Sequence, residues 1–236
     1  MDDFQTALDM AIGLLVSFDH ELVTIVRLSL QVSLAAVSLA AVLGLPVGAM
    51  VAVCRFPGQA VVRVVLNALL GLPPVVVGLT VYLLLSRAGP LGSLGLLFTP
   101  TAMVVAQCVL VMPIIAAFTQ QTVADLYEEY AEQLRSLGVG PVRALWTLLW
   151  EGRFSLLTGL LAGFGRASAE VGAVIIVGGN MYQVTRVMTT TIALETSKGN
   201  LALALALGML LMLLVLAVNA AAMVARAVAK RIAGAG

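Results

Sequence analysis

The sequence predicts an all-α protein that crosses a membrane about five times. Of its 236 residues, 61% are hydrophobic and only 11% are charged, whereas about a quarter of the residues of a soluble domain are charged. A chain of this size cannot bury so many apolar helices on all sides in water. Its composition therefore excludes an ordinary soluble domain, and its net charge of +1 gives no indication of a nucleic-acid partner.

Apolar runs long enough to cross a bilayer, which takes about 20 residues, occur along most of the chain. They are residues 28–53, 65–85, 102–118, 156–177 and 201–224. Glycines or prolines interrupt the first four runs, which favours close helix packing and kinks that neighbouring helices must satisfy. We expect a tight bundle that lines a pathway whose shape can change.

The first 23 residues are expected to lie outside the membrane core. Apolar side chains at helical spacing predict a short helix over residues 4–18 that lies on the membrane surface. No basic residue precedes Arg27, so we expect no cleaved signal peptide. His20, the only histidine, is expected in a solvated connection after this helix.

Lysines and arginines predict the orientation, because they gather in cytoplasmic loops. Eight of them share one side: Arg55, Arg63, Arg135, Arg143, Arg153, Arg226, Lys230 and Arg231. Arg87, Arg186 and Lys198 lie in loops of the other side. We therefore expect residues 1–23 outside the cell and the tail, residues 226–236, in the cytoplasm.

The connection between the third and fourth runs, residues 119–153, contains a polar segment, residues 128–150. Its pattern predicts two short amphipathic helices separated by Gly138 and Gly140, with Pro141 in the first turn of the second. Their apolar stripes are Tyr130, Leu134 and Leu137, and then Val142, Leu145 and Leu149. An ordered amphipathic loop between membrane spans indicates contact with a partner outside the membrane.

This loop carries a family resemblance. Residues 132–138, EQLRSLG, have the glutamate-to-glycine spacing of the E-A-A-x-x-x-G motif. The segment thus resembles the membrane subunits of binding-protein-dependent ABC importers. Gln133 and Leu134 replace the two small residues of that motif, and the proline of its later I-x-L-P element is absent.

Arg166 and Glu170 are charged residues within the fourth apolar run, and their spacing of four predicts one helix face. A charge at the bilayer centre costs about 2.5–3.5 kcal/mol on insertion scales, so we expect the two to pair. The pair is either a structural neutralisation or a charge that rearranges during gating. The surrounding residues 164–173, FGRASAEVGA, resemble the F-x-R-A-x-x-E-x-G-A stretch of molybdate, sulfate and tungstate permeases.

Two further stretches strengthen that resemblance. Residues 72–78, LPPVVVG, resemble the second-span signature of the same permeases, and residues 178–191 are most similar to tungstate permeases. In this external stretch, Asn180, Thr185 and Arg186 are candidates for docking a binding protein or contacting an oxyanion, since arginine and hydroxyl groups suit tetrahedral oxygens.

The resemblance implies a type I importer permease with a MetI-like bundle over residues 24–225. It also implies a homodimer, two cytoplasmic ATPase subunits that use ATP and Mg²⁺, and an external oxyanion-binding protein in a cell-membrane complex. Tungstate is the favoured cargo, with molybdate or sulfate as alternatives. The residues implied to contact the ATPase are Tyr130, Glu132, Leu134, Arg135, Leu137 and Gly138.

Two other classes compete with this interpretation. An intramembrane enzyme is disfavoured, because the sequence has no H-E-x-x-H or G-x-S-x-G motif and no metal-ligand cluster. It also lacks the G-x-x-x-x-G-K-[ST] loop, so we expect no cofactor or ATP on this chain. A stand-alone channel or secondary transporter would not need an ordered cytoplasmic dock.

Overall fold

The computed structural model describes Gly13 and residues 20–234, and every regular element in them is helical. The predicted surface helix over residues 4–18 lies, apart from Gly13, outside the described residues. In chain order the elements are α2 (His20–Val53), α3 (Gln59–Ala68), η1 (Leu69–Gly71), α4 (Pro74–Leu85), η2 (Gly92–Leu94), α5 (Pro100–Ser136), α6 (Pro141–Glu151), α7 (Arg153–Ser168), α8 (Gly172–Gly178), α9 (Met188–Ser197) and α10 (Leu201–Gly234).

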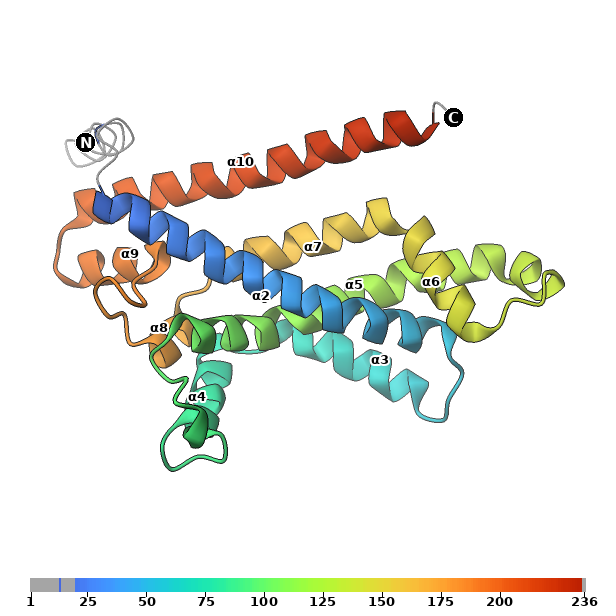
Figure 1. The fold of residues 1–236 in the computed structure, drawn as a ribbon, viewed down its shortest axis with the longest axis horizontal. Helices are drawn as coiled ribbons and strands as arrows, with labels where there is room; N and C mark the ends of the chain where they lie inside the picture. The colour runs from blue at the N-terminus through green and yellow to red at the C-terminus, as the bar shows by residue number, and fades with distance from the viewer. Residues whose placement is uncertain (1–12, 14–19, 235–236) are drawn as a thin grey trace.

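Two long helices, α2 and α5, pack along each other and form the centre of the bundle (Figure 1). Small residues of α2 allow this approach: a Cβ on Gly48 would lie 2.3 Å from the carbonyl oxygen of Ala116. Helix α2 begins at His20, so the prediction of a connection at His20 is wrong. The apolar run continues N-terminally through residues 21–27, which have no helix breaker.

The second predicted span, residues 65–85, is not one straight helix. The axes of the α3–η1 segment and α4 differ by 99°. Leu72 and Pro73 both precede a proline, which disfavours the helical region, and both have extended backbone with ψ of 123° and 120°. Helix α4 then begins at Pro74 and leaves the bundle axis, as Figure 1 shows.

The fourth predicted span, residues 156–177, is also broken. Helices α7 and α8 meet at an angle of 59°, with residues 169–171 between them. Within the described residues, α2, α5 and α10 are long and apolar enough to cross a membrane, and each bent pair brings the number to as many as five. The five expected spans are therefore present only if each bent pair of helices crosses the membrane as one span.

One end of the bundle carries α6, the α2–α3 loop and the C-terminal end of α10, and the opposite end carries α9 and the start of α2 (Figure 1). Helix α10 is the least embedded long helix, since only 22% of its apolar window is buried. It packs mainly on α9, and a hydrogen bond of 3.1 Å from Arg226 to Thr158 joins it to α7.

Candidate functional site

The polar segment after α5 consists of a helix end, a glycine turn and α6. Residues 128–136 belong to α5 itself, so the predicted separate first helix is wrong. Glutamate, glutamine, alanine, leucine and arginine dominate this stretch, and these are strong helix formers without a breaker. Helix α5 therefore continues, without interruption, beyond the apolar run.

Gly138 ends α5 with a left-handed backbone, at φ of +67°. The amide of Gly138 donates to the carbonyl of Arg135 (3.0 Å), and the amide of Val139 donates to that of Leu134 (2.9 Å). These two bonds form a Schellman motif, which satisfies carbonyls at the helix end. The expected turn at Gly138 and the start of α6 at Pro141 are both confirmed.

Helix α6 has one buried and one exposed apolar face. Ala144, Leu145 and Leu148 pack into a cluster with α2 and α5. On the other face Val142, Trp146 and Trp150 are 70%, 61% and 69% exposed. The predicted stripe of Val142, Leu145 and Leu149 thus does not form a single surface.

The residues implied to contact the ATPase are likewise partly buried and partly exposed. Tyr130 and Leu134 are half-buried against the α2–α5–α6 cluster, so they pack within this chain. Glu132, Arg135 and Leu137 are exposed beside the Gly138 turn. A partner at this end would meet these three side chains together with the exposed face of α6.

Sequence reasoning missed Trp146 and Trp150. Their spacing of four, continued from Val142, was the available signal, because it places all three side chains on one helix face. The Trp150 carbonyl accepts a 2.7 Å hydrogen bond from Arg153, whose guanidinium also lies 4.7 Å from the Trp150 ring centroid. Arg153, the first residue of α7, therefore holds the exposed indole of Trp150 near the end of α6.

The charged residues of the fourth run lie at the break between α7 and α8. Arg166 Nη1 is 3.2 Å from Glu170 Oε2, so the predicted pair is present. Glu170 is not in a helix, however, and the other oxygen of its carboxylate accepts from the amide of Ala173 (3.1 Å) in the first turn of α8. Its side chain is 3% exposed, whereas that of Arg166 is 35% exposed.

Neighbouring helices hold this break in place. The hydroxyl of Thr189 on α9 donates to the carbonyl of Glu170 (2.8 Å), and the amide of Gln107 on α5 donates to that of Ala167 (3.0 Å). On the far side, a Cβ on Gly78 would lie 2.7 Å from Ala173 Cα, so α4 and α8 are in close contact. The carbonyls of Ala167 and Glu170 are thus satisfied, as a membrane interior requires.

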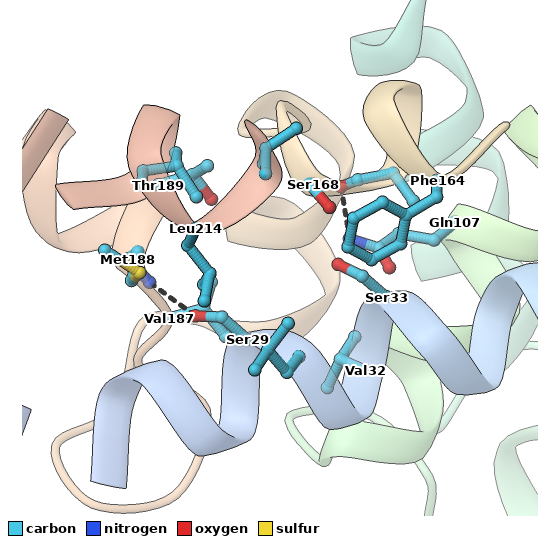
Figure 2. A pocket seen from close by; sticks show the side chains of 14 residues that line it. Ser29, Val32, Ser33, Gln107, Phe164, Ser168, Val187, Met188, Thr189 and Leu214 are labelled. Carbon is cyan, nitrogen blue, oxygen red and sulfur yellow. Dashed lines mark hydrogen bonds between the residues drawn. The ribbon is translucent and has the colours of Figure 1, made fainter. Parts of the chain in front are cut away.

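Figure 2 shows a cavity beside the break. Ser29, Ser33, Gln107, Ser168 and Thr189 give it polar groups, among apolar side chains that include Phe164 and Met188. The amide of Met188 donates to the Ser29 hydroxyl (2.8 Å), which links α9 to α2. The cavity measures about 20 Å³, room for about one water molecule.

The external candidates Asn180, Thr185 and Arg186 do not converge on one point. Thr185 is fully buried, and its hydroxyl donates to Gly178 and accepts from the amide of Met181. Asn180 has a left-handed backbone, and its buried side-chain oxygen has no partner among the described residues. Arg186 lies over the Tyr182 ring, with Nη1 at 3.9 Å from the Glu21 carboxylate.

Arg186 and Glu21 line a pocket of about 530 Å³ between α2 and the loop before α9. Of the three candidates, only Arg186 lines this pocket, where it is held by an aromatic ring and a carboxylate.

Known proteins are similar to most of this chain. The model of the family "Binding-protein-dependent transport system inner membrane component" matches residues 44–232. The "Probable anion ABC transporter permease protein" of Haloferax volcanii is 43% identical over 185 residues, which are 76% of this chain and 80% of that protein. The "Tungstate uptake system permease protein TupB" of Peptoclostridium acidaminophilum is 40% identical over 210 residues, 89% of this chain and 92% of that protein.

A more distant relative is the "Molybdenum transport system permease protein ModB" of Azotobacter vinelandii, which is 28% identical over 182 residues, 74% of this chain and 80% of that protein. The family match includes the α5–α6 turn, the α7–α8 break and α10. The chain therefore belongs to the multi-pass inner-membrane permease components of binding-protein-dependent ABC importers, which are not the catalytic subunits of those transporters.

Proposed function

We propose that two copies of this chain form the membrane pathway of a tungstate importer. A separate ATPase subunit drives it from the α6 end, and an external binding protein delivers the anion at the α9 end. The observation that carries this proposal is the exposed apolar face of α6, which follows the hydrogen-bonded turn at Gly138.

The α6 end has the properties of a protein-binding surface. Trp146 and Trp150 are exposed on one face, and tryptophan is enriched among the residues that dominate binding energy. Glu132 and Arg135 are exposed on the last turns of α5, and charges at the edge of an interface set orientation more than affinity. The eight lysines and arginines assigned to this side favour a cytoplasmic position for this end, with the N-terminus outside.

We infer a second copy because the polar cavity beside the α7–α8 break is too small to serve as the passage. The polar cavity near the membrane break holds about one water molecule, which is too small for a tetrahedral anion. An apolar groove of about 730 Å³ lies between α7 and α10, and α10 exposes Met212, Leu213 and Leu216. These surfaces favour contact with another copy or with lipid.

Tungstate is the proposed cargo because the tungstate permease of Peptoclostridium acidaminophilum matches over 92% of its length. The molybdenum permease of Azotobacter vinelandii matches at lower identity, so molybdate is the second candidate. Reconstitution with the ATPase and binding protein should give ATP-dependent uptake of tungstate in preference to molybdate and sulfate. Uptake without ATP would instead indicate a channel or secondary transporter.

The docking surface is tested by replacing both tryptophans of α6 with alanine. We expect Trp146→Ala with Trp150→Ala to weaken ATPase binding at least tenfold, since central tryptophans each contribute about 2 kcal/mol or more. Leu83→Ala is the matched control, because Leu83 is 57% exposed on α4, away from α6. Equal ATPase binding by both variants would contradict the assignment. Cysteine labelling of Asp3→Cys and Gly234→Cys from opposite faces would support the orientation.

A further inference from the structure

Helix α7 has an exposed face without large apolar side chains. All of α7 lies within the described residues, and its phenylalanines and leucines are buried or half-buried. Its exposed positions are Ser155, Thr158 and Ala162. Helix α10, by contrast, exposes Leu213 and Leu216, as a helix that contacts lipid does. The exposed face of α7 therefore suits water or protein better than acyl chains.

Arg166 lies on this face, four residues after Ala162. Its side chain is 35% exposed, whereas that of its partner Glu170 is 3% exposed. Both oxygens of the Glu170 carboxylate are engaged, one by Arg166 and the other by the amide of Ala173. A guanidinium has five N–H donors, and Glu170 is the only ion-pair partner of Arg166 among the described residues. The pair thus turns its cationic group outward, with donors left for a further acceptor.

The position of Arg166 in the membrane limits what that acceptor can be. Arg166 is near the middle of the apolar run 156–177, which α7 and α8 can carry across the membrane as one bent span. Charged residues at such depth face protein or a water-filled cavity, and they mark ion pathways. A lipid tail has no acceptor to offer. The remaining donors of Arg166 therefore require water or an anion beside this face.

We propose that Arg166 contacts the transported oxyanion in a water-filled pathway along this face of α7. This inference rests on the proposed function, which supplies the anion, and it adds the group that the anion meets inside the membrane. A planar guanidinium can bind two oxygens of a tetrahedral anion at once. Glu170 positions the guanidinium and reduces its net attraction, since conduction requires binding that is weak enough for release.

Substituted-cysteine labelling of the complete transporter in lipid nanodiscs tests the pathway. Cys54→Ala and Cys108→Ala remove the two cysteines of the chain, and Ala162→Cys then places one thiol beside Arg166. We expect this thiol to react with both an anionic and a cationic water-soluble methanethiosulfonate. Relative to a free thiol in solution, the anionic reagent should be favoured about tenfold, because a charge about 6 Å away attracts one reagent and repels the other.

Two controls accompany this labelling. Saturating tungstate should slow both reactions at Ala162→Cys, because the anion occupies the same pathway. Leu213→Cys is the matched control in the same cysteine-free background. Leu213 is 54% exposed on the apolar surface of α10, so lipid or the second copy should protect this thiol from both reagents.

Substitution of the charged pair tests the contact itself. Arg166→Gln with Glu170→Gln removes both charges, so it should abolish the anionic preference at Ala162→Cys and slow tungstate uptake about tenfold, as the loss of one charge-assisted hydrogen bond predicts. Arg166→Lys keeps a cation without the planar fork, so it should retain the preference and still slow uptake. Arg87→Gln, in the exposed α4–α5 loop, should match the wild type in both assays.

No reaction at Ala162→Cys would overturn the proposal and assign this face to lipid or to the second copy. Reaction without anionic preference, or a preference that survives the double glutamine variant, would also overturn it. The labelling at Ala162→Cys decides the matter even if the double variant does not fold. Anionic preference without tungstate uptake would support the pathway and refute the proposed cargo, whereas uptake without reaction at Ala162→Cys would refute the pathway alone.

Discussion

Replacing Gly138 by valine tests whether the turn between α5 and α6 transmits motion. Gly138 has φ of +67°, and a Cβ built there would meet no atom within 4 Å. The Cβ of the new side chain therefore meets no clash, and the cost comes from the backbone. A left-handed conformation costs an ordinary residue about 1–2 kcal/mol, and a β-branched residue is a marked outlier there.

The chain has two ways to respond to this substitution. It either keeps the turn and accepts the strain, or it opens the turn and loses the hydrogen bonds to Arg135 and Leu134. Each of those bonds contributes about 0.5–1.5 kcal/mol, so both routes cost about 2 kcal/mol. That energy corresponds to a factor of about 30 in the population of the native turn. If the ATPase binds only the native turn, its affinity should fall by about that factor.

Gly140→Val provides the matched control, two residues away. Gly140 also has open space around its Cβ, but its φ of −69° and ψ of 161° suit any residue before a proline. ATPase affinity and tungstate uptake should be measured for both variants in proteoliposomes. We expect Gly138→Val to lose both and Gly140→Val to retain both. Equal behaviour of the two variants would refute the reasoning, because both positions have open space at Cβ and only Gly138 has a left-handed backbone.

Two further predictions concern charged groups. Arg166→Ala should lower the stability of the detergent-solubilised protein by about 3 kcal/mol, because it leaves the buried carboxylate of Glu170 unpaired. The double variant Arg166→Ala with Glu170→Ala should lose less stability. If thermal unfolding shows the double variant to be no more stable than the less stable single variant, the pairing is contradicted. The hydrogen bond from Lys198 (2.7 Å) holds the pKa of Glu195 below its usual range. The ionised Glu195 carboxylate therefore stabilises the folded protein fully above the unfolded-state pKa of about 4.3, and this stabilisation is lost as pH falls through the lower folded-state pKa. The difference in thermal midpoint between wild type and Glu195→Gln should accordingly vanish on acidification.

The α5–α6 region shows which local features the sequence determines. Gly138 and Pro141 specified the turn and the start of α6, because each residue type restricts backbone angles whatever surrounds it. Spacing places Val142, Trp146 and Trp150 on one face of α6, but which face would be buried was not predictable. That helix is apolar on both faces, and only the position of α2 and α5 decides that Leu145 is buried and Trp146 is exposed.

For the membrane spans, too, the sequence determined one part and the tertiary structure decided the rest. Composition and apolar run length determined by themselves that the chain is helical and embedded in a membrane, because unpaired backbone groups are too costly in lipid. Run length could not reveal the bends of 99° and 59°, since an apolar segment satisfies the length criterion whether straight or broken. The pairing of Arg166 with Glu170 was likewise predictable from spacing. Only the tertiary structure placed Glu170 at a break. There the Ala173 amide of α8 binds its carboxylate and the Thr189 hydroxyl of α9 binds its carbonyl, because residues of the following helices satisfy the groups that the broken helix leaves free.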